Sequence, residues 1–184
     1  MSPDVPIPIF DLDGTLVDSD RALADAFVAL GVPRDQVSFG HVLADECARW
    51  GLRVEDYLAV YDAEAVQPFP GASELVGALG RWAVCSNKHA HSGHAELDRL
   101  GWRPEVALFA DAFGGPKQLA PVLEAMGGLE PDEVLFVGDT DHDRACARAV
   151  GAPFVLAGWN PRATPQAGDV VVSSPVDVLA LLSS

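Results

Sequence analysis

Short apolar segments alternate with helical patterns over most of this chain. Six segments have the composition of short buried strands, at residues 5–10, 82–85, 106–110, 134–137, 154–156 and 170–172. Helical patterns follow them, at residues 73–79, 89–100, 117–126, 143–150 and 176–182. Strands that alternate with helices predict a parallel sheet covered on both faces. We therefore expect an α/β fold, a Rossmann-like parallel sheet flanked by helices.

One stretch interrupts this alternation. Residues 18–30, 37–50 and 54–66 have helical patterns with no strand between them, and the run Gln67-Pro68-Phe69-Pro70-Gly71 ends the series. We interpret this stretch as a small helical cap, inserted after the first strand, that folds as a lid over the strand ends. The expected domains are an α/β core of residues 1–16 and 71–184 and a helical cap of residues 17–70.

The net charge of the chain limits which macromolecules it can bind. Twelve Lys and Arg residues face 27 Asp and Glu residues, a net charge of −15. Nucleic acid and anionic membrane surfaces are bound by surplus basic residues, so we expect neither as a partner. No apolar run approaches the ~20 residues that span a bilayer, and no charged-then-apolar leader precedes the first strand. The three cysteines are odd in number, and Cys85 and Cys146 lie in apolar surroundings, which favours buried thiols. We expect a cytoplasmic protein.

The first strand runs into two acids spaced one residue apart. Residues 5–10 are followed by Asp11-Leu12-Asp13-Gly14-Thr15. Open α/β sheets bind ligands at the carboxyl ends of their strands, and side chains two apart on an extended backbone share one side. Two carboxylates so near to each other repel unless a cation or a proton lies between them. The alternative is a loop of ordinary turn-forming residues.

Three later segments place polar groups at the ends of predicted elements. Ser86-Asn87 follows the strand at 82–85, although such a pair commonly forms a turn or a helix cap. Lys117 lies at a helix start, where the helix dipole disfavours it, and a solvated surface lysine is the alternative. Asp139 and Asp143 follow the strand at 134–137, and Asp143 also suits a helix N-cap. We assign Asp141 to solvent.

These segments resemble, in order, the four signatures of the haloacid dehalogenase-like hydrolases. The run Asp-Leu-Asp-Gly-Thr-Leu-Val-Asp-Ser at residues 11–19 resembles the first signature, in the form of the phosphoglycolate-phosphatase-like branch. Ser86 and Lys117 stand in the places of the second and third, although Gln118 replaces the proline that commonly follows the lysine. Gly138-Asp139 with Asp143 resembles the fourth. The resemblance covers the chain outside the helical stretch, where only helical character is shared.

The resemblance implies a Mg²⁺-dependent phosphatase that hydrolyses a small phosphate monoester through an aspartyl phosphate. Asp11 would attack phosphorus, and Asp13 would act first as general acid and then as general base. Mg²⁺ would be bound by the Asp11 carboxylate, the Asp13 main-chain carbonyl and Asp139. Asp143 would either bind the ion directly or hold the residues that bind it. Ser86 and Lys117 would clamp the phosphoryl group, and the substrate-binding residues are Ser86, Asn87 and Lys117. The expected partner is a small phosphate ester, and the expected state is a monomer or homodimer.

Other functions remain open at this point. A phosphomutase of the β-phosphoglucomutase kind uses the same residues, and a non-catalytic phosphate-binding module would not need Asp13. A dehalogenase would need neither a second acid nor a metal, which Asp13, Asp139 and Asp143 argue against. The cationic cap residues that could contact the leaving group, or lie on the surface, are Arg21, His41, Arg49 and Arg53. His89, His91 and His94 do not share a helix face, which disfavours a zinc site, but His89 could reach the substrate.

Overall fold

The computed structural model describes residues 5–183, and its main sheet has six strands, all parallel. The strands lie in the order β5-β4-β1-β6-β7-β8. Their bounds are β1 Ile7–Phe10, β4 Ala83–Cys85, β5 Val106–Leu108, β6 Val134–Gly138, β7 Phe154–Ala157 and β8 Val170–Val172. The central strands read as unbroken apolar runs because both of their faces are buried. This arrangement confirms the predicted parallel sheet.

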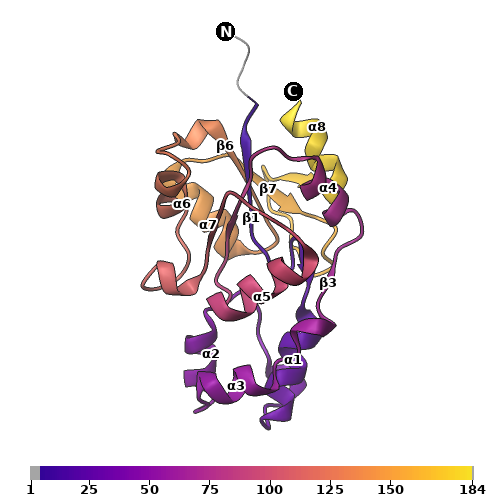
Figure 1. Ribbon diagram of the computed structural model, residues 1–184, viewed down its shortest axis with the longest axis vertical. Coiled ribbons are helices and arrows are strands. Elements are labelled where there is room, and N and C mark those ends of the chain that lie inside the picture. Colours follow the sequence, from indigo (N-terminus) through magenta and orange to yellow (C-terminus); the bar gives the residue numbers. More distant parts are fainter. Residues whose placement is uncertain (1–4, 184) are drawn as a thin grey trace.

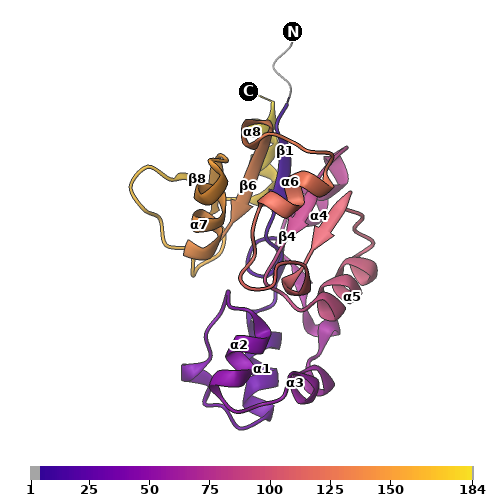
Figure 2. The same ribbon diagram turned by 90° about the vertical axis from the view of Figure 1, so that its left-hand side faces the viewer.

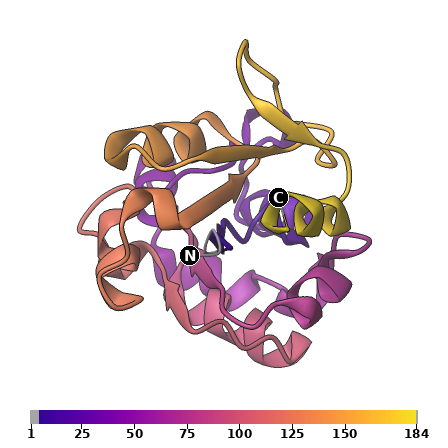
Figure 3. The same cartoon turned by 90° about the horizontal axis from the view of Figure 1, so that it is seen from above.

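Alternate residues of each strand pack against opposite helical layers. Phe10 and Val137 join the core that includes side chains of α4 Ala72–Ala78, α5 Ala90–Leu100 and α8 Val178–Leu182. Ile9 and Phe136 join a second core with α6 Ala120–Ala125 and α7 Asp141–Val150. Figure 3 shows α6 and α7 in orange on one side of the strands, and α4, α5 and α8 on the other. The sheet is therefore flanked by helices on both faces, as predicted.

The helices of the inserted stretch lie together at one end of the molecule. They are α1 Asp20–Ala29, α2 Leu43–Arg49 and α3 Val54–Val60. Figures 1 and 2 show them beyond the carboxyl end of β1. A two-stranded antiparallel ribbon, β2 Val17–Asp18 with β3 Gln67–Pro68, carries the chain into and out of them. They share a small apolar core of their own around Phe27, Cys47 and Tyr57. The division into domains at residues 16/17 and 70/71 stays a prediction.

Several helices are shorter than the sequence pattern predicts. The helix expected over 37–50 begins at Leu43, because Gly40 adopts a positive φ of 82° just before it. The helix expected over 54–66 ends at Val60 and is followed by a 3₁₀ turn, Ala63–Ala65. The helix expected from Lys117 begins at Ala120. The other 3₁₀ turns are Arg34–Gln36, Ala110–Ala112, Pro131–Glu133 and Pro175–Asp177.

Within residues 5–183, no helix combines the length and the apolar character that crossing a bilayer requires.

Candidate active site

Three polar residues follow the carboxyl ends of three adjacent strands. Asp11 comes directly after β1, Ser86 after β4 and Asp139 after β6. Strand β1 pairs in parallel with β4 on one side and with β6 on the other, and the pairing continues to its last residue. The three side chains are therefore brought to one edge of the sheet, which is where open α/β folds bind ligands.

A cluster of three buried carboxylates lies at this edge. One carboxylate oxygen from each of Asp11, Asp139 and Asp143 lies within 4.8 Å of the other two. The three residues are 4%, 3% and 0% exposed. Residues 11 and 139, far apart in the chain, are thus near enough to share one ion. Hard oxygen donors in this number are the set that Mg²⁺ prefers, so the donor chemistry fits a divalent cation of that type.

The cluster is electrostatically strained when no cation is bound. Burial raises the pKa of Asp11 to about 6, with Lys117 acting in the opposite direction. Burial, together with the neighbouring carboxylates of Asp143 and Asp11, raises the pKa of Asp139 to about 8. Both groups ordinarily ionise near 3.8. A bound divalent cation would restore their ionisation, because it stabilises the charged form of each carboxylate.

Lys117 supplies the positive charge beside the cluster. Its Nζ lies 2.8 Å from Asp11 Oδ2 and 2.5 Å from Asp143 Oδ1. The side chain is 2% exposed, and the neighbouring carboxylates raise its pKa, so the ammonium keeps its charge despite burial. The alternative of a solvated surface lysine is wrong. A buried ammonium between two carboxylates can neutralise charge on Asp11 and on an anion bound next to it.

Asp143 is held in one orientation by the start of α7. Its Oδ2 accepts hydrogen bonds from Asp139 N–H at 3.1 Å and from Thr140 N–H at 2.9 Å, and from the Thr140 hydroxyl at 2.6 Å. Thr140 is the N-cap of the helix, so the N-cap expected at Asp143 lies three residues earlier and Asp143 completes the capping box. Gly138 makes the approach possible, because a Cβ there would lie 2.2 Å from the Asp143 carboxyl carbon.

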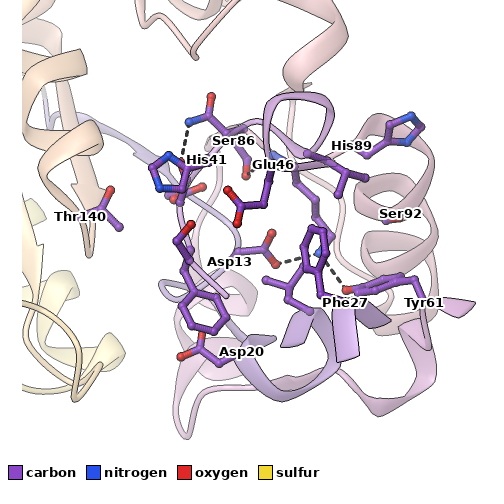
Figure 4. Close-up of a pocket in the computed structure, with 18 of the residues that line it drawn as sticks. Asp13, Asp20, Phe27, His41, Glu46, Tyr61, Ser86, His89, Ser92 and Thr140 are labelled. Carbon is purple, nitrogen blue, oxygen red and sulfur yellow. Dashed lines mark hydrogen bonds and ion pairs between the residues drawn. The ribbon is translucent and has the colours of Figure 1, made fainter. Parts of the chain in front are cut away.

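Asp13 belongs to a different ion-pair network from Asp11. Its Oδ1 lies 2.8 Å from the Nζ of Lys88, which also contacts Glu96 Oε1 at 3.0 Å and the Tyr61 hydroxyl at 3.0 Å. Figure 4 shows the contacts of Asp13 and Tyr61 that meet at this ammonium. The Tyr61 hydroxyl in turn donates to Glu96 at 2.6 Å. Asp13 is thereby held by a buried cation while 19% of its side chain stays exposed.

Three members of this network were not predicted from the sequence, namely Lys88, Glu96 and Tyr61. Lys88 directly follows Ser86-Asn87, and that position was the available signal. Glu96 lies in the middle of α5 and is 0% exposed, which no spacing argument indicated. Burial raises the pKa of the Glu96 carboxyl to about 7, against the opposing effect of Lys88.

Ser86 and Asn87 line the same pocket but differ in what they offer. The Ser86 hydroxyl oxygen accepts a hydrogen bond from Lys88 N–H at 3.2 Å, so its proton is available to a ligand. Asn87 Oδ1 accepts from Lys117 N–H at 2.6 Å, and its Nδ2 donates to Gly40 C=O at 2.9 Å. Asn87 therefore ties the lysine loop to the helical segment, and its role in binding substrate stays a prediction.

The loop after β7 adds two residues that the sequence analysis missed. Asn160 Nδ2 lies 2.8 Å from Asp139 Oδ2 and 2.8 Å from Gly14 C=O, so it joins two sides of the site. Arg162 pairs through two nitrogens with Asp20, and its Nη2 lies 3.6 Å from Asp139 Oδ2. Both follow the carboxyl end of a predicted strand, which was the signal that could have found them.

The pocket lies between the sheet edge and the helical segment. Asp11 lines it from the sheet side. Figure 4 shows Asp13 and Ser86 on the same side, and His41 on the side of the segment. His89 also lines the pocket, and its contact with a substrate stays a prediction. Of the four basic cap residues considered from the sequence, the three arginines are not among the lining residues. Arg21 and Arg53 are mostly exposed. Arg21 pairs with an acid of its own helix, α1, and Arg53, the N-cap residue of α3, pairs with an acid of α3.

Comparison with known proteins gives a consistent result. A family model described as haloacid dehalogenase-like hydrolase matches residues 8–151. A phosphoglycolate phosphatase of Rhodospirillum rubrum is 31% identical, over 86% of this chain and 82% of that protein. A probable phosphatase, IndB, of Dickeya dadantii is 32% identical, over 88% of this chain and 84% of that protein.

A solved structure supports the fold. The crystal structure of a putative phosphoglycolate phosphatase from Lactobacillus plantarum superposes with a TM-score of 0.76, covering 96% of this chain and 99% of that one. The sequences are 22% identical, so this likeness concerns the fold alone.

Proposed function

This chain belongs to the haloacid dehalogenase-like hydrolase family, and we propose that it hydrolyses a small phosphate monoester through an aspartyl phosphate on Asp11. The chain is thus a hydrolase, and the names of its relatives support phosphoric monoesters as its substrates. The observation that carries the proposal is the cluster of Asp11, Asp139 and Asp143 around the Lys117 ammonium. This cluster provides a nucleophile, a cation site and a fixed positive charge within a few ångströms.

The cation proposed for the site is Mg²⁺. Its ligands would be the carboxylates of Asp11 and Asp139 and the main-chain carbonyl of Asp13, with Asp143 in support. Bound there, it would neutralise part of the charge on the phosphoryl oxygens. The three hydrogen bonds and the lysine contact that already engage the Asp143 carboxylate favour a supporting role for that residue.

Asp11 is proposed as the nucleophile. One of its oxygens forms a bond to phosphorus while the bond between phosphorus and the leaving oxygen breaks. Asp11 Oδ1 accepts a hydrogen bond from Leu12 N–H at 2.7 Å, and Oδ2 is held by Lys117, so the carboxylate is fixed before substrate binds. Orientation of this kind lowers the entropic part of the barrier. In the second step water attacks phosphorus, the bond to Asp11 breaks, and inorganic phosphate leaves.

Asp13 is proposed as the proton donor and acceptor. In the first step its carboxyl gives a proton to the leaving oxygen, and in the second its carboxylate takes a proton from the attacking water. The Lys88 contact is made through Oδ1, so the second oxygen can exchange the proton. Ser86 and Lys117 are proposed to hold the phosphoryl oxygens, and the helical segment to shield the reacting groups from bulk water.

Hydrolysis is favoured over the other outcomes that the sequence left open. A phosphomutase would use the same catalytic residues, but the relatives matched here are named as phosphatases. A binding module without catalysis would have no use for an acid held beside the nucleophile by a buried lysine.

The test is a screen of phosphate esters with Mg²⁺ and with EDTA, in which released phosphate is measured. We expect metal-dependent release that the Asp11→Asn variant loses by at least about a thousandfold, because the amide is a poor nucleophile. Asp132→Asn, an exposed acid remote from the pocket, is the matched control and should keep full activity. Undiminished turnover by Asp11→Asn would contradict the nucleophile, and equal activity in EDTA would contradict the metal.

A further inference from the structure

The helical segment gives the pocket a wall that is apolar and acidic. Two charged residues of α1 and α2 line the pocket, and both are acids, Asp20 and Glu46. The apolar side chains that these helices and α3 contribute are those of Leu23, Phe27, Leu43 and Tyr57. The leaving group of a substrate held at Asp11 would lie against this wall, since Asp11 lines the pocket from the opposite side.

Glu46 has one carboxylate oxygen free for a ligand. The residue is 6% exposed, and its Oε1 accepts a hydrogen bond from Trp50 Nε1 at 3.3 Å and lies 3.3 Å from Arg49 Nη1. Within residues 5–183, no hydrogen bond or ion pair reaches Oε2. Figure 4 shows the Glu46 side chain turned into the pocket, on the side of Asp13. A carboxylate oxygen without a protein donor can accept a hydrogen bond from a ligand, and a charged donor on that ligand makes this bond stronger.

The Lys88 ammonium, on the side of the pocket where a leaving group would lie, already has a partner for each of its N–H donors. Lys88 has three N–H donors, and its Nζ has three partners, which are Asp13, Glu96 and Tyr61. Its side chain is 2% exposed. Lys88 has no donor left to bind a second anionic group of a substrate, unless one of its existing ion pairs is broken.

The arginines near the pocket are paired as well. Arg162 makes a two-nitrogen contact with Asp20 and also faces Asp139. Arg49 pairs with Glu46, and half of its side chain is exposed. Among the lining residues, four carboxylates face one lysine, one arginine and two histidines, His41 and His89, before any phosphate is bound. The pocket therefore offers no surplus positive charge beyond what a metal-bound phosphoryl group would need.

On the premise of the phosphatase function, we propose that the preferred substrates are phosphate esters of small amino alcohols. Their ammonium group binds Glu46 Oε2 and the faces of the aromatic wall, and esters with a second anionic group are disfavoured. Like charges held near each other in a partly buried site repel, and the tenfold preference expected from this corresponds to about 1.4 kcal/mol. Aromatic faces add attraction for an ammonium.

A series of esters with one carbon skeleton tests the charge directly. The two-carbon members are 2-aminoethyl phosphate, 2-hydroxyethyl phosphate, ethyl phosphate and 2-phosphoglycolate, which differ only in the group that would face Glu46. Three-carbon counterparts of the amine and the carboxylate control for the distance between the bound phosphate and Glu46. With Mg²⁺ present, we expect kcat/KM to be at least about tenfold higher for the amine than for the carboxylate, with the neutral members between.

Two variants connect the preference to Glu46. Glu46→Gln keeps the shape and the Trp50 hydrogen bond but removes the charge, and should reduce the ratio of amine to carboxylate about tenfold. Glu55→Gln removes an exposed acid of α3 that pairs with Arg53, and should leave the ratio unchanged. If Glu46→Gln does not fold, the ratio measured for the wild-type chain decides alone.

The outcomes separate this proposal from the proposed function. A preference for the amine that disappears in the Glu46→Gln variant would support this proposal. Fastest hydrolysis of 2-phosphoglycolate would overturn it while the phosphatase function stood, and so would a preference that Glu46→Gln leaves intact. Release of phosphate from no ester in the broader screen would end the phosphatase function, and this proposal with it.

Discussion

At the residue scale, the site depends on backbone positions that allow close approach as much as on its charged groups. Gly14 has a φ of 78°, and a Cβ there would lie 2.4 Å from Asp139 Oδ2 and 2.8 Å from Asn160 Nδ2. Its main-chain oxygen also accepts a hydrogen bond from Asn160. The loop that carries Asp11 and Asp13 can therefore reach Asp139 only with a glycine at this position.

We expect Gly14→Ala to weaken metal binding and activity by at least about tenfold, because the methyl group displaces the Asp139 carboxylate. Gly128→Ala is the matched control, since Gly128 has nearly the same φ, 77°, but no atom within 4 Å of the place its methyl group would take. Both variants share the backbone strain, about 1 kcal/mol. Calorimetric titration with Mg²⁺ separates the two effects. Equal affinities in the two variants would show that the close approach at Gly14 is unimportant.

At the scale of elements, a buried network joins the end of the helical segment to the sheet edge. Tyr61 follows α3, Lys88 lies in the turn between β4 and α5, and Glu96 lies on α5. Their side chains meet at the Lys88 ammonium together with Asp13. Because removing one partner leaves an uncompensated buried charge, the network fixes how these three elements meet.

We expect Lys88→Met to lower the free energy of unfolding by about 3–5 kcal/mol, because Glu96 and Asp13 then lose their counter-charge. The double variant Lys88→Met with Glu96→Gln should recover part of this loss. Arg53→Met, which breaks an exposed pair with Glu55, is the control and should cost less than about 0.5 kcal/mol. Urea denaturation of the wild-type chain and the three variants gives all four values. A Lys88→Met variant as stable as the control would refute the network as a structural link.

At the scale of the whole molecule, the acidic cluster couples stability to pH and metal. Without a cation the pKa of Asp11 is about 6 and that of Asp139 about 8, whereas both are near 3.8 when the chain is unfolded. Between about pH 4 and 8 the folded chain therefore binds protons that the unfolded chain has released. The free energy of unfolding should consequently fall as the pH rises through this range, if no metal is present.

Added Mg²⁺ should stabilise the chain more at a pH of about 8 than at about 5, because protons compete with the cation at the lower pH. Thermal unfolding with and without Mg²⁺ measures this, and about 1 kcal/mol corresponds to roughly 2–4 °C in Tm for a chain of this length. Asp139→Asn should lose the difference, and Asp132→Asn should keep it. A shift in Tm of the same size at both pH values would argue against metal binding by these carboxylates.

The order of residues was sufficient to predict the parallel α/β fold, because strand and helix periodicities are local properties of the chain. It also placed Asp11, Ser86 and Asp139 after the ends of predicted strands, which is where open α/β sheets bind ligands. The family resemblance added Lys117 and Asp143, whose proximity no spacing in the chain indicated.

Which charges neutralise one another became apparent only in the folded chain. Lys117 lies with Asp11 and Asp143, whereas Lys88 lies with Asp13 and Glu96. Residues in such pairs are separated by 8 to 106 positions, so their contacts depend on how the layers and the inserted helices pack. Electrostatic energies depend on distance and burial, neither of which is encoded in local periodicity. For that reason the acidic wall at Glu46, and the substrate preference inferred from it, could be recognised only after the tertiary packing was known.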